Sequence, residues 1–161
     1  MDLEHLQNFF SVLSGFLTPV IAVIVAWIAY QQMKINKYKI RIDLFERRMQ
    51  VFSVIRESLS KMFTDGSSQK VNWNDFYFAI EQSKFLLNNE LQLSLNEIEI
   101  KMRQMRATEM LLYGSDGKGG LPVGEQRNKV CDENSELLKW LIDQNEPLQK
   151  KFTDFMKMNK M

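Results

Sequence analysis

The chain has 161 residues, of which 45% are hydrophobic and 25% are charged, and its formal net charge is +1. This composition suits one folded domain and gives no sign of long disorder, and a nearly neutral chain lacks the strongly basic domain of a dedicated nucleic-acid binder. The single cysteine, Cys131, excludes an intrachain disulfide framework and cysteine-rich metal sites.

The segment from Phe9 to Tyr30 contains 22 residues without a charge. As a helix it would be about 33 Å long, which matches a hydrocarbon core of about 30 Å, so we expect a transmembrane helix at 9–30. Pro19 lies inside this segment and is expected to kink the helix, which membrane helices tolerate. The acidic start of the chain and the large Trp27 do not fit a cleaved signal peptide.

Basic residues flank only one end of this segment. Asp2 and Glu4 precede it, whereas all 21 lysines and arginines follow residue 30. Because basic flanks stay in the cytoplasm, we predict a single-pass membrane protein with an extracytoplasmic tail at 1–8 and a cytoplasmic domain at 31–161. Four of these residues are close enough to the span to contact anionic lipid, although setting the topology is the simpler role: Lys34, Lys37, Lys39 and Arg41.

Small residues recur on one side of the span, at a spacing of three to four residues. Such residues allow two helices to approach closely, and hydroxyl groups can form hydrogen bonds between them, so we expect self-association through this face. Small residues are also common in membrane helices for other reasons, and this alternative stays open. The predicted association face is Ser11, Ser14, Gly15, Thr18, Ala22 and Ala26.

Residues 31–63 contain neither glycine nor proline, so the membrane helix can continue into the cytoplasm. One apolar stripe has the 3-4 spacing of a coiled-coil seam, and a second lies on roughly the opposite side. Two apolar faces predict the central helix of a bundle, although the part near the membrane could pair as a coil. The seam is Ile35, Tyr38, Ile42, Phe45, Met49, Phe52, Leu59 and Phe63, and the second stripe is Ile40, Leu44, Val51 and Ile55.

After a turn at 64–71, a helix is expected to begin at Asn72 or Asn74, since either is a good N-cap, and to stop near Asn88. The next helix begins near residue 91. If Ser94 and Glu97 form a capping box, it begins as late as residue 95.

Residues 114–124 contain five glycines and one proline and are expected to form a flexible loop. A further helix is predicted from about 125 to 143. Pro147 then requires a kink or a new start before a last amphipathic segment. The predicted fold is therefore all-α, with one N-terminal transmembrane helix continuing into an antiparallel bundle of about four helices.

Sites for chemistry have little support in the sequence. His5 lies outside the membrane in the predicted topology and Cys131 lies inside, so the two cannot form a nucleophilic pair. The glycine-rich segment 114–120 contains a lysine but lacks the P-loop spacing and a preceding strand. We therefore expect no enzyme activity, no cofactor, no metal ion, no nucleic acid and no small-molecule substrate.

Four segments together resemble an uncharacterised family of small bacterial single-pass inner-membrane proteins with a cytoplasmic helical domain. The segments are RIDLFERRMQVFSVIRESL at 41–59, KFLLNNEL at 84–91, LLKWL at 137–141 and KFTDFMKM at 151–158. The first contains an LFxxRxxVF-like pattern, whereas Phe155 and Met156 stand where the family usually has Tyr-Leu. The resemblance implies a bacterial inner (plasma) membrane location and a helical fold, and no active site.

The sequence predicts a non-enzymatic, membrane-anchored helical interaction or scaffold module that self-associates. Its partners would be the lipid bilayer, further copies of itself and a cytoplasmic protein. An alternative is a membrane-perturbing effector or pore-forming subunit of a bacterial conflict (defence) system, in which Pro19 and the Ser/Thr stripe would line or gate the pore. A third, an enzyme with a carboxylate site, lacks clustered acids. The predicted surface for a protein partner is Trp73, Phe78, Phe85 and Trp140.

Overall fold

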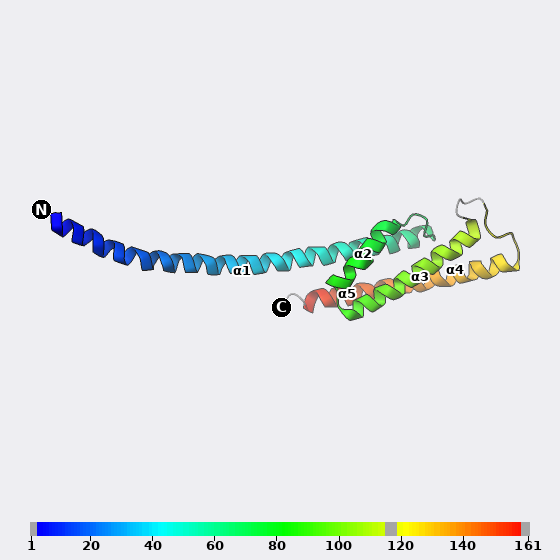
Figure 1. Ribbon diagram of the computed structural model, residues 1–161. Coiled ribbons are helices and arrows are strands. Elements are labelled where there is room, and N and C mark those ends of the chain that lie inside the picture. Colours follow the sequence, from blue (N-terminus) through cyan, green and yellow to red (C-terminus); the bar gives the residue numbers. More distant parts are fainter. Residues whose placement is uncertain (1–2, 115–118, 159–161) are drawn as a thin grey trace. The chain divides into compact units, whose positions relative to one another are not determined.

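The computed structural model describes the backbone of residues 3–114 and 119–158, and the side chains of residue 17 and of residues 19–114 and 119–157. These residues form five α-helices and no strand, so the all-α prediction is confirmed for this part of the chain. The chain divides into two compact units, Met1–Asp43 and Leu44–Met161. The helices are α1 (Leu3–Asp65), α2 (Trp73–Leu86), α3 (Asn89–Tyr113), α4 (Glu125–Asp143) and α5 (Asn145–Met158) (Figure 1).

The first unit is described from Leu3 to Asp43, all of it within α1, and the rest of α1 belongs to the second unit. The helix passes through Pro19 without ending, although a proline inside a helix removes one backbone hydrogen bond. No glycine or proline follows until Gly66, so nothing in the sequence interrupts the helix before its end at Asp65. The prediction that one unbroken helix joins residues 9–30 to residues 31–63 is confirmed.

Within the part of the chain whose side chains are described, no helix is long and apolar enough to cross a membrane. The transmembrane part of the fold prediction therefore has no support from the structure. The predicted span at 9–30 lies partly outside the described side chains, which omit residues 9–16 and 18, and the side chains of the predicted tail at 1–8 lie outside them as well.

The second unit is a helical bundle built around α3. α3 and α4 lie side by side and run in opposite directions, and α2 and α5 also pack against α3 (Figure 1). The buried residues of α3 recur every three or four positions, which places them on one face of the helix. That face and its neighbours form one core, whose largest members include Val51, Ile55, Leu59, Phe76, Ile80, Leu91, Ile98, Met102, Met105, Leu141, Leu148 and Phe152.

The predicted 35–63 seam is divided between exposed and packed residues. In the bundle, Leu59 is buried and Phe52 is half-buried, and the Phe52 ring stacks on Phe152 of α5 with centroids 4.1 Å apart. Val51 and Ile55 of the second stripe are buried in the same core. The distal part of the seam therefore belongs to the bundle, as the two-faced pattern predicted. Exposed residues of the seam are Ile35, Tyr38, Ile42, Phe45 and Met49.

Two asparagines start the helices of the bundle. Asn72 caps α2, as expected, and its side-chain oxygen accepts a hydrogen bond from Asp75 N. Asn88 caps α3, and its Oδ1 accepts from Leu91 N at 3.1 Å. The capping box at Ser94 and Glu97 is wrong, because Ser94 already lies inside α3, where its hydroxyl donates to Glu90 O at 3.2 Å.

α5 begins directly after α4, with Gln144 between them. Pro147 is the third residue of α5, in a turn whose N–H groups have no partner within the helix, so the missing proton costs no helical hydrogen bond. Leu148 N donates to Gln144 O at 3.0 Å and completes the first turn. The new start predicted at Pro147 is confirmed.

Candidate interaction surfaces

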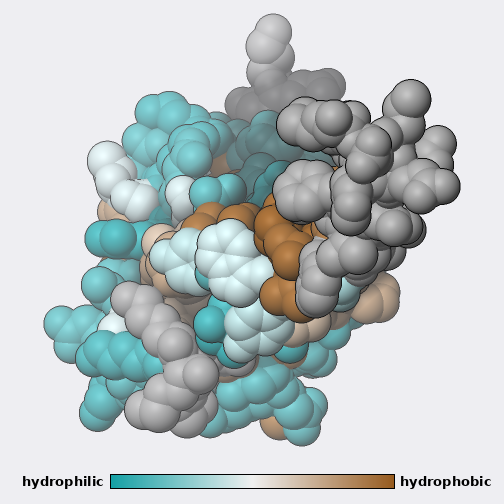
Figure 2. Space-filling model, turned by 90° about the vertical axis from the view of Figure 1, so that its left-hand side faces the viewer, coloured by the Kyte–Doolittle hydropathy of each residue, from teal (hydrophilic) through white to brown (hydrophobic). Residues whose placement is uncertain are grey.

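α1 has an apolar and exposed surface between Leu17 and Tyr30. Every side chain described in this range is exposed. Figure 2 views the molecule from the side of the N-terminus in Figure 1, and brown, apolar side chains lie open there beside the grey residues. A helix that is apolar all round requires apolar surroundings, which the described residues do not supply here. The large exposed residues are Leu17, Val20, Ile21, Val23, Ile24, Val25, Trp27, Ile28 and Tyr30.

The predicted small-residue association face is described only in part. Ala22 and Ala26 are exposed. Ala26 precedes Ile35 of the coiled-coil seam by nine residues, which is about two and a half turns, so the two lie on opposite sides of α1. The small-residue face and the seam are therefore separate surfaces of one helix. The side chains of Ser11, Ser14, Gly15 and Thr18 lie outside the described residues.

The predicted anionic-lipid contacts all lie on the exposed surface of α1. The ammonium group of Lys34 lies 4.9 Å from the centroid of the Tyr30 ring, in a cation–π contact. This contact directs the Lys34 side chain toward the uncharged segment that ends at Tyr30. The four exposed cations are Lys34, Lys37, Lys39 and Arg41.

Arg48 joins three helices of the bundle. It belongs to α1, its Nε donates to the carbonyl oxygen of Leu86 at 2.9 Å, and its guanidinium lies 4.8 Å from the ring centroid of Phe155. Leu86 ends α2 and Phe155 lies in α5. The sequence segments 41–59, 84–91 and 151–158 therefore meet at a packing contact.

Two arginines of α3 cover the aromatic start of α2. Arg103 lies 5.2 Å from the ring centroid of Tyr77, and Arg106 lies 4.8 Å from that of Trp73. The neighbouring Glu99 carboxylate, which is also an ion-pair partner, raises the pKa of Arg103 above its ordinary value. These contacts hold α2 against α3 and leave Trp73 half-buried beneath a cation.

The four residues predicted to meet a protein partner do not share one environment. Phe78 and Phe85 of α2 are 66% and 88% exposed. Trp73 and Trp140 are half-buried against the core, and Lys101 lies 5.9 Å from the ring centroid of Trp140. The two phenylalanines are seven residues apart, about two turns, and therefore lie on one face of α2.

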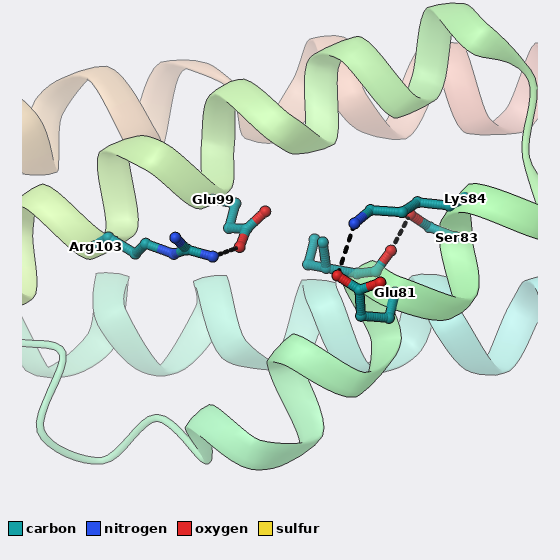
Figure 3. Close-up of polar contacts among 6 residues, drawn as sticks. Glu81, Ser83, Lys84, Glu99 and Arg103 are labelled. Atoms are coloured by element: carbon teal, nitrogen blue, oxygen red, sulfur yellow. Dashed lines mark hydrogen bonds and ion pairs between the residues drawn. The ribbon is translucent and has the colours of Figure 1, made fainter.

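Several carboxylates of the bundle form ion pairs with lysine or arginine side chains. Figure 3 shows Glu99 paired with Arg103 within α3, and Glu81 paired with Lys84 within α2 at 2.7 Å. Neither pair places two acids together as a general acid and base would require. Over the described residues, no group of three or more His, Cys, Asp or Glu could hold a metal ion.

Glu109 is a buried carboxylate that the sequence did not single out. It is only 5% exposed, and its oxygens accept hydrogen bonds from Ser68 N at 2.8 and 3.0 Å and from the Ser68 hydroxyl. Ser68 lies in the turn between α1 and α2, so Glu109 of α3 fixes that turn. Since the two residues are 41 positions apart, no local pattern marks the contact.

The ends of the predicted flexible loop 114–124 contact α3. Leu121 N donates to Leu111 O at 2.9 Å, and Arg127 Nη1 donates to the carbonyl oxygens of Leu112 and Leu121 at 2.9 and 2.7 Å. A Cβ atom at Gly120 would collide with the Leu112 carbonyl, so this approach requires glycine. Residues 115–118 lie outside the described part of the chain.

Cys131 is exposed on α4. His5 lies outside the described side chains. Comparison of the chain with protein-family models, with curated proteins and with solved structures gave no match.

Proposed function

We propose that this protein is a membrane-anchored helical interaction module of a bacterial inner membrane, which self-associates and acts by binding rather than by catalysis. Residues 9–30 would cross the bilayer once, with the N-terminus outside. The bundle would then lie in the cytoplasm and offer its exposed surface to a protein partner.

The observation that carries this proposal is the exposed apolar surface of α1. From Leu17 to Tyr30 every described side chain is exposed, and the sequence has no charge from Phe9 to Tyr30. Exposed apolar surface costs about 25 cal/mol for each Å² in contact with water, so an aqueous setting would make this segment strongly unfavourable. Lipid tails remove that cost without any protein partner.

The residues around the C-terminal end of the uncharged segment support a position at the membrane–water interface. Trp27 and Tyr30 are amphipathic rings of the kind that collects at the membrane–water boundary, and Lys34 bends over Tyr30. Lys37, Lys39 and Arg41 follow on the same helix, where they can reach anionic headgroups.

A binding role suits the bundle better than a catalytic one. Acids such as Glu81 and Glu99 pair with neighbouring cations, and Phe85 of α2 is 88% exposed. Exposed aromatic residues are enriched at protein interfaces, so the Phe78 and Phe85 face is the surface that we assign to a cytoplasmic partner.

The natural cysteine allows a direct test in intact bacterial cells. Because Cys131 is exposed, a membrane-impermeant maleimide should label it only after permeabilisation. In a Cys131→Ser chain, Asp2→Cys should be labelled from outside without permeabilisation. Alkaline carbonate should leave both chains in the membrane pellet.

Release of the chain into the carbonate supernatant would refute the anchor, and labelling of Cys131 in intact cells would refute the orientation. The same cells report on the pore alternative, since collapse of the membrane potential on expression would favour a membrane-perturbing effector over an interaction module.

A further inference from the structure

A second regular face runs along the exposed part of α1, distinct from the small-residue face. Seven residues recur at intervals of three and four from Ile21 to Ile42, all within the first unit, and five of them are isoleucines. This is the spacing of heptad positions a and d, with isoleucine at every a position. The seven residues of this isoleucine seam are Ile21, Ile24, Ile28, Gln31, Ile35, Tyr38 and Ile42.

The isoleucine seam is open to its surroundings. Ile35 is 64% exposed and Ile42 is 40% exposed, and the other seam residues except the half-buried Gln31 are exposed as well. Gln31 is the single polar residue of the seam and lies just beyond the uncharged segment. A single polar residue in such a seam fixes the register of two paired helices, because its side-chain amide can form a hydrogen bond with the partner helix.

Ala22 and Ala26 lie on the other side of the helix. Ala26 and Ile35 are separated by about two and a half turns, and Ala22 and Ile42 by about five and a half turns. In one pair of straight or gently supercoiled helices, only one of these faces can lie at the interface. The seam extends over three heptads of described residues, from Ile21 to Ile42, and six of its seven residues are exposed.

We infer that a second copy of this chain packs in parallel against the isoleucine seam, as a left-handed coiled coil that begins in the membrane and continues beyond it. This inference rests on the proposed function, because the anchor makes neighbouring copies parallel and confines them to one plane. Ala22 and Ala26 then face away from the partner.

Charged residues flank the seam at positions that this register brings together. Arg41 and Glu46 are five residues apart, at the g and e positions that face each other between parallel strands. Lys34 and Lys39 have the same spacing and oppose each other in the pair. The arrangement therefore has one attractive and one repulsive ionic contact, and each can be reversed by substitution.

The test uses disulfide formation in native membranes containing the full-length chain in a Cys131→Ser background. Disulfides need Cβ atoms about 4 Å apart, so Ile42→Cys should cross-link about tenfold more than Ile40→Cys. Ile40 is a matched control, because it is also an exposed isoleucine but lies half a turn away. Ala26→Cys reports on the small-residue face.

Charge reversal provides a second, independent measurement of the same pair. Arg41→Glu alone and Glu46→Arg alone should each reduce the cross-linked fraction of Ile42→Cys about two- to fivefold, and the two together should restore it. Lys39→Glu should raise it, because repulsion from Lys34 becomes attraction. These residues are exposed, so the variants keep the fold of the bundle.

Cross-linking at Ala26→Cys without cross-linking at Ile42→Cys would overturn the inference and leave self-association standing. Equal cross-linking of Ile40→Cys and Ile42→Cys would overturn it as well, because it would show that the helices meet by random collision. Absence of any cross-link would overturn both the seam and self-association, while carbonate extraction of the same membranes would show separately whether the anchor holds.

Discussion

Isoleucines of α1 are exposed in the first compact unit, whereas an isoleucine of the same helix is buried in the second. Ile24 in the first unit is 51% exposed, whereas Ile55 in the second is 1% exposed, and both belong to α1. Apolar residues recur along α1 in both places, although residues 51–62 also include Arg56, Glu57 and Lys61. The difference is that α2 to α5 supply apolar partners for residues 51–62, while the described chain supplies none for residues 17–30. Exposed apolar residues in a regular pattern therefore indicate surroundings that the chain itself does not provide.

The largest expected effect comes from truncating these two isoleucines. Ile55→Ala should lower the free energy of unfolding of the bundle by about 2–5 kcal/mol, because it removes a fully buried side chain and leaves a cavity. Ile24→Ala should leave it unchanged within about 0.5 kcal/mol. Urea unfolding of the full-length chain in mild detergent, followed by circular dichroism, would measure both. Equal losses for the two variants would contradict the division between the units.

A smaller effect is expected at the buried carboxylate of the bundle. Glu109→Ala leaves the N–H and hydroxyl of Ser68 without their acceptor, which should cost about 1–3 kcal/mol. Glu125→Ala removes an exposed ion pair with Lys129 and should cost less than about 1 kcal/mol. The same unfolding measurement compares them. If Glu125→Ala proves the more harmful, the Ser68 contact does not stabilise the turn.

The smallest of these effects concerns the start of α3. Asn88→Ala removes the side chain that caps Leu91 N and should destabilise the bundle by about 1 kcal/mol. Ser94→Ala should change its stability by less than about 0.5 kcal/mol, since its hydroxyl bonds only to Glu90 O within the helix. The reverse order of the two losses would favour a helix start at the predicted capping box.

Local patterns predicted the helices well, because spacing and caps act over a few residues. Of the two candidate N-caps, Asn72 starts α2. Of the two outcomes expected at Pro147, a kink or a new start, the structure has a new start at Asn145. The absence of glycine and proline allowed a continuous helix, and α1 is continuous. The start of α3 was predicted too late, near residue 91 or 95. Asn88, which was expected only to stop the preceding helix, caps α3.

Contacts between distant residues could not be predicted in this way. Arg48 and Leu86 are 38 positions apart, and Arg48 also reaches Phe155 in the last helix. The three residues meet at one guanidinium group, a contact that packs three helices together.

The contact between Glu109 and Ser68 also constrains the order of folding. Ser68 leaves the ribosome 41 residues before its acceptor, which corresponds to a few seconds of synthesis at about 5–20 residues per second. During that time α1 can complete its local hydrogen bonds, whereas the turn after it has no carboxylate to bind. The α1–α2 turn is therefore expected to become fixed only after α3 has been made and has packed, so the N-terminal helix can engage its surroundings before the bundle closes.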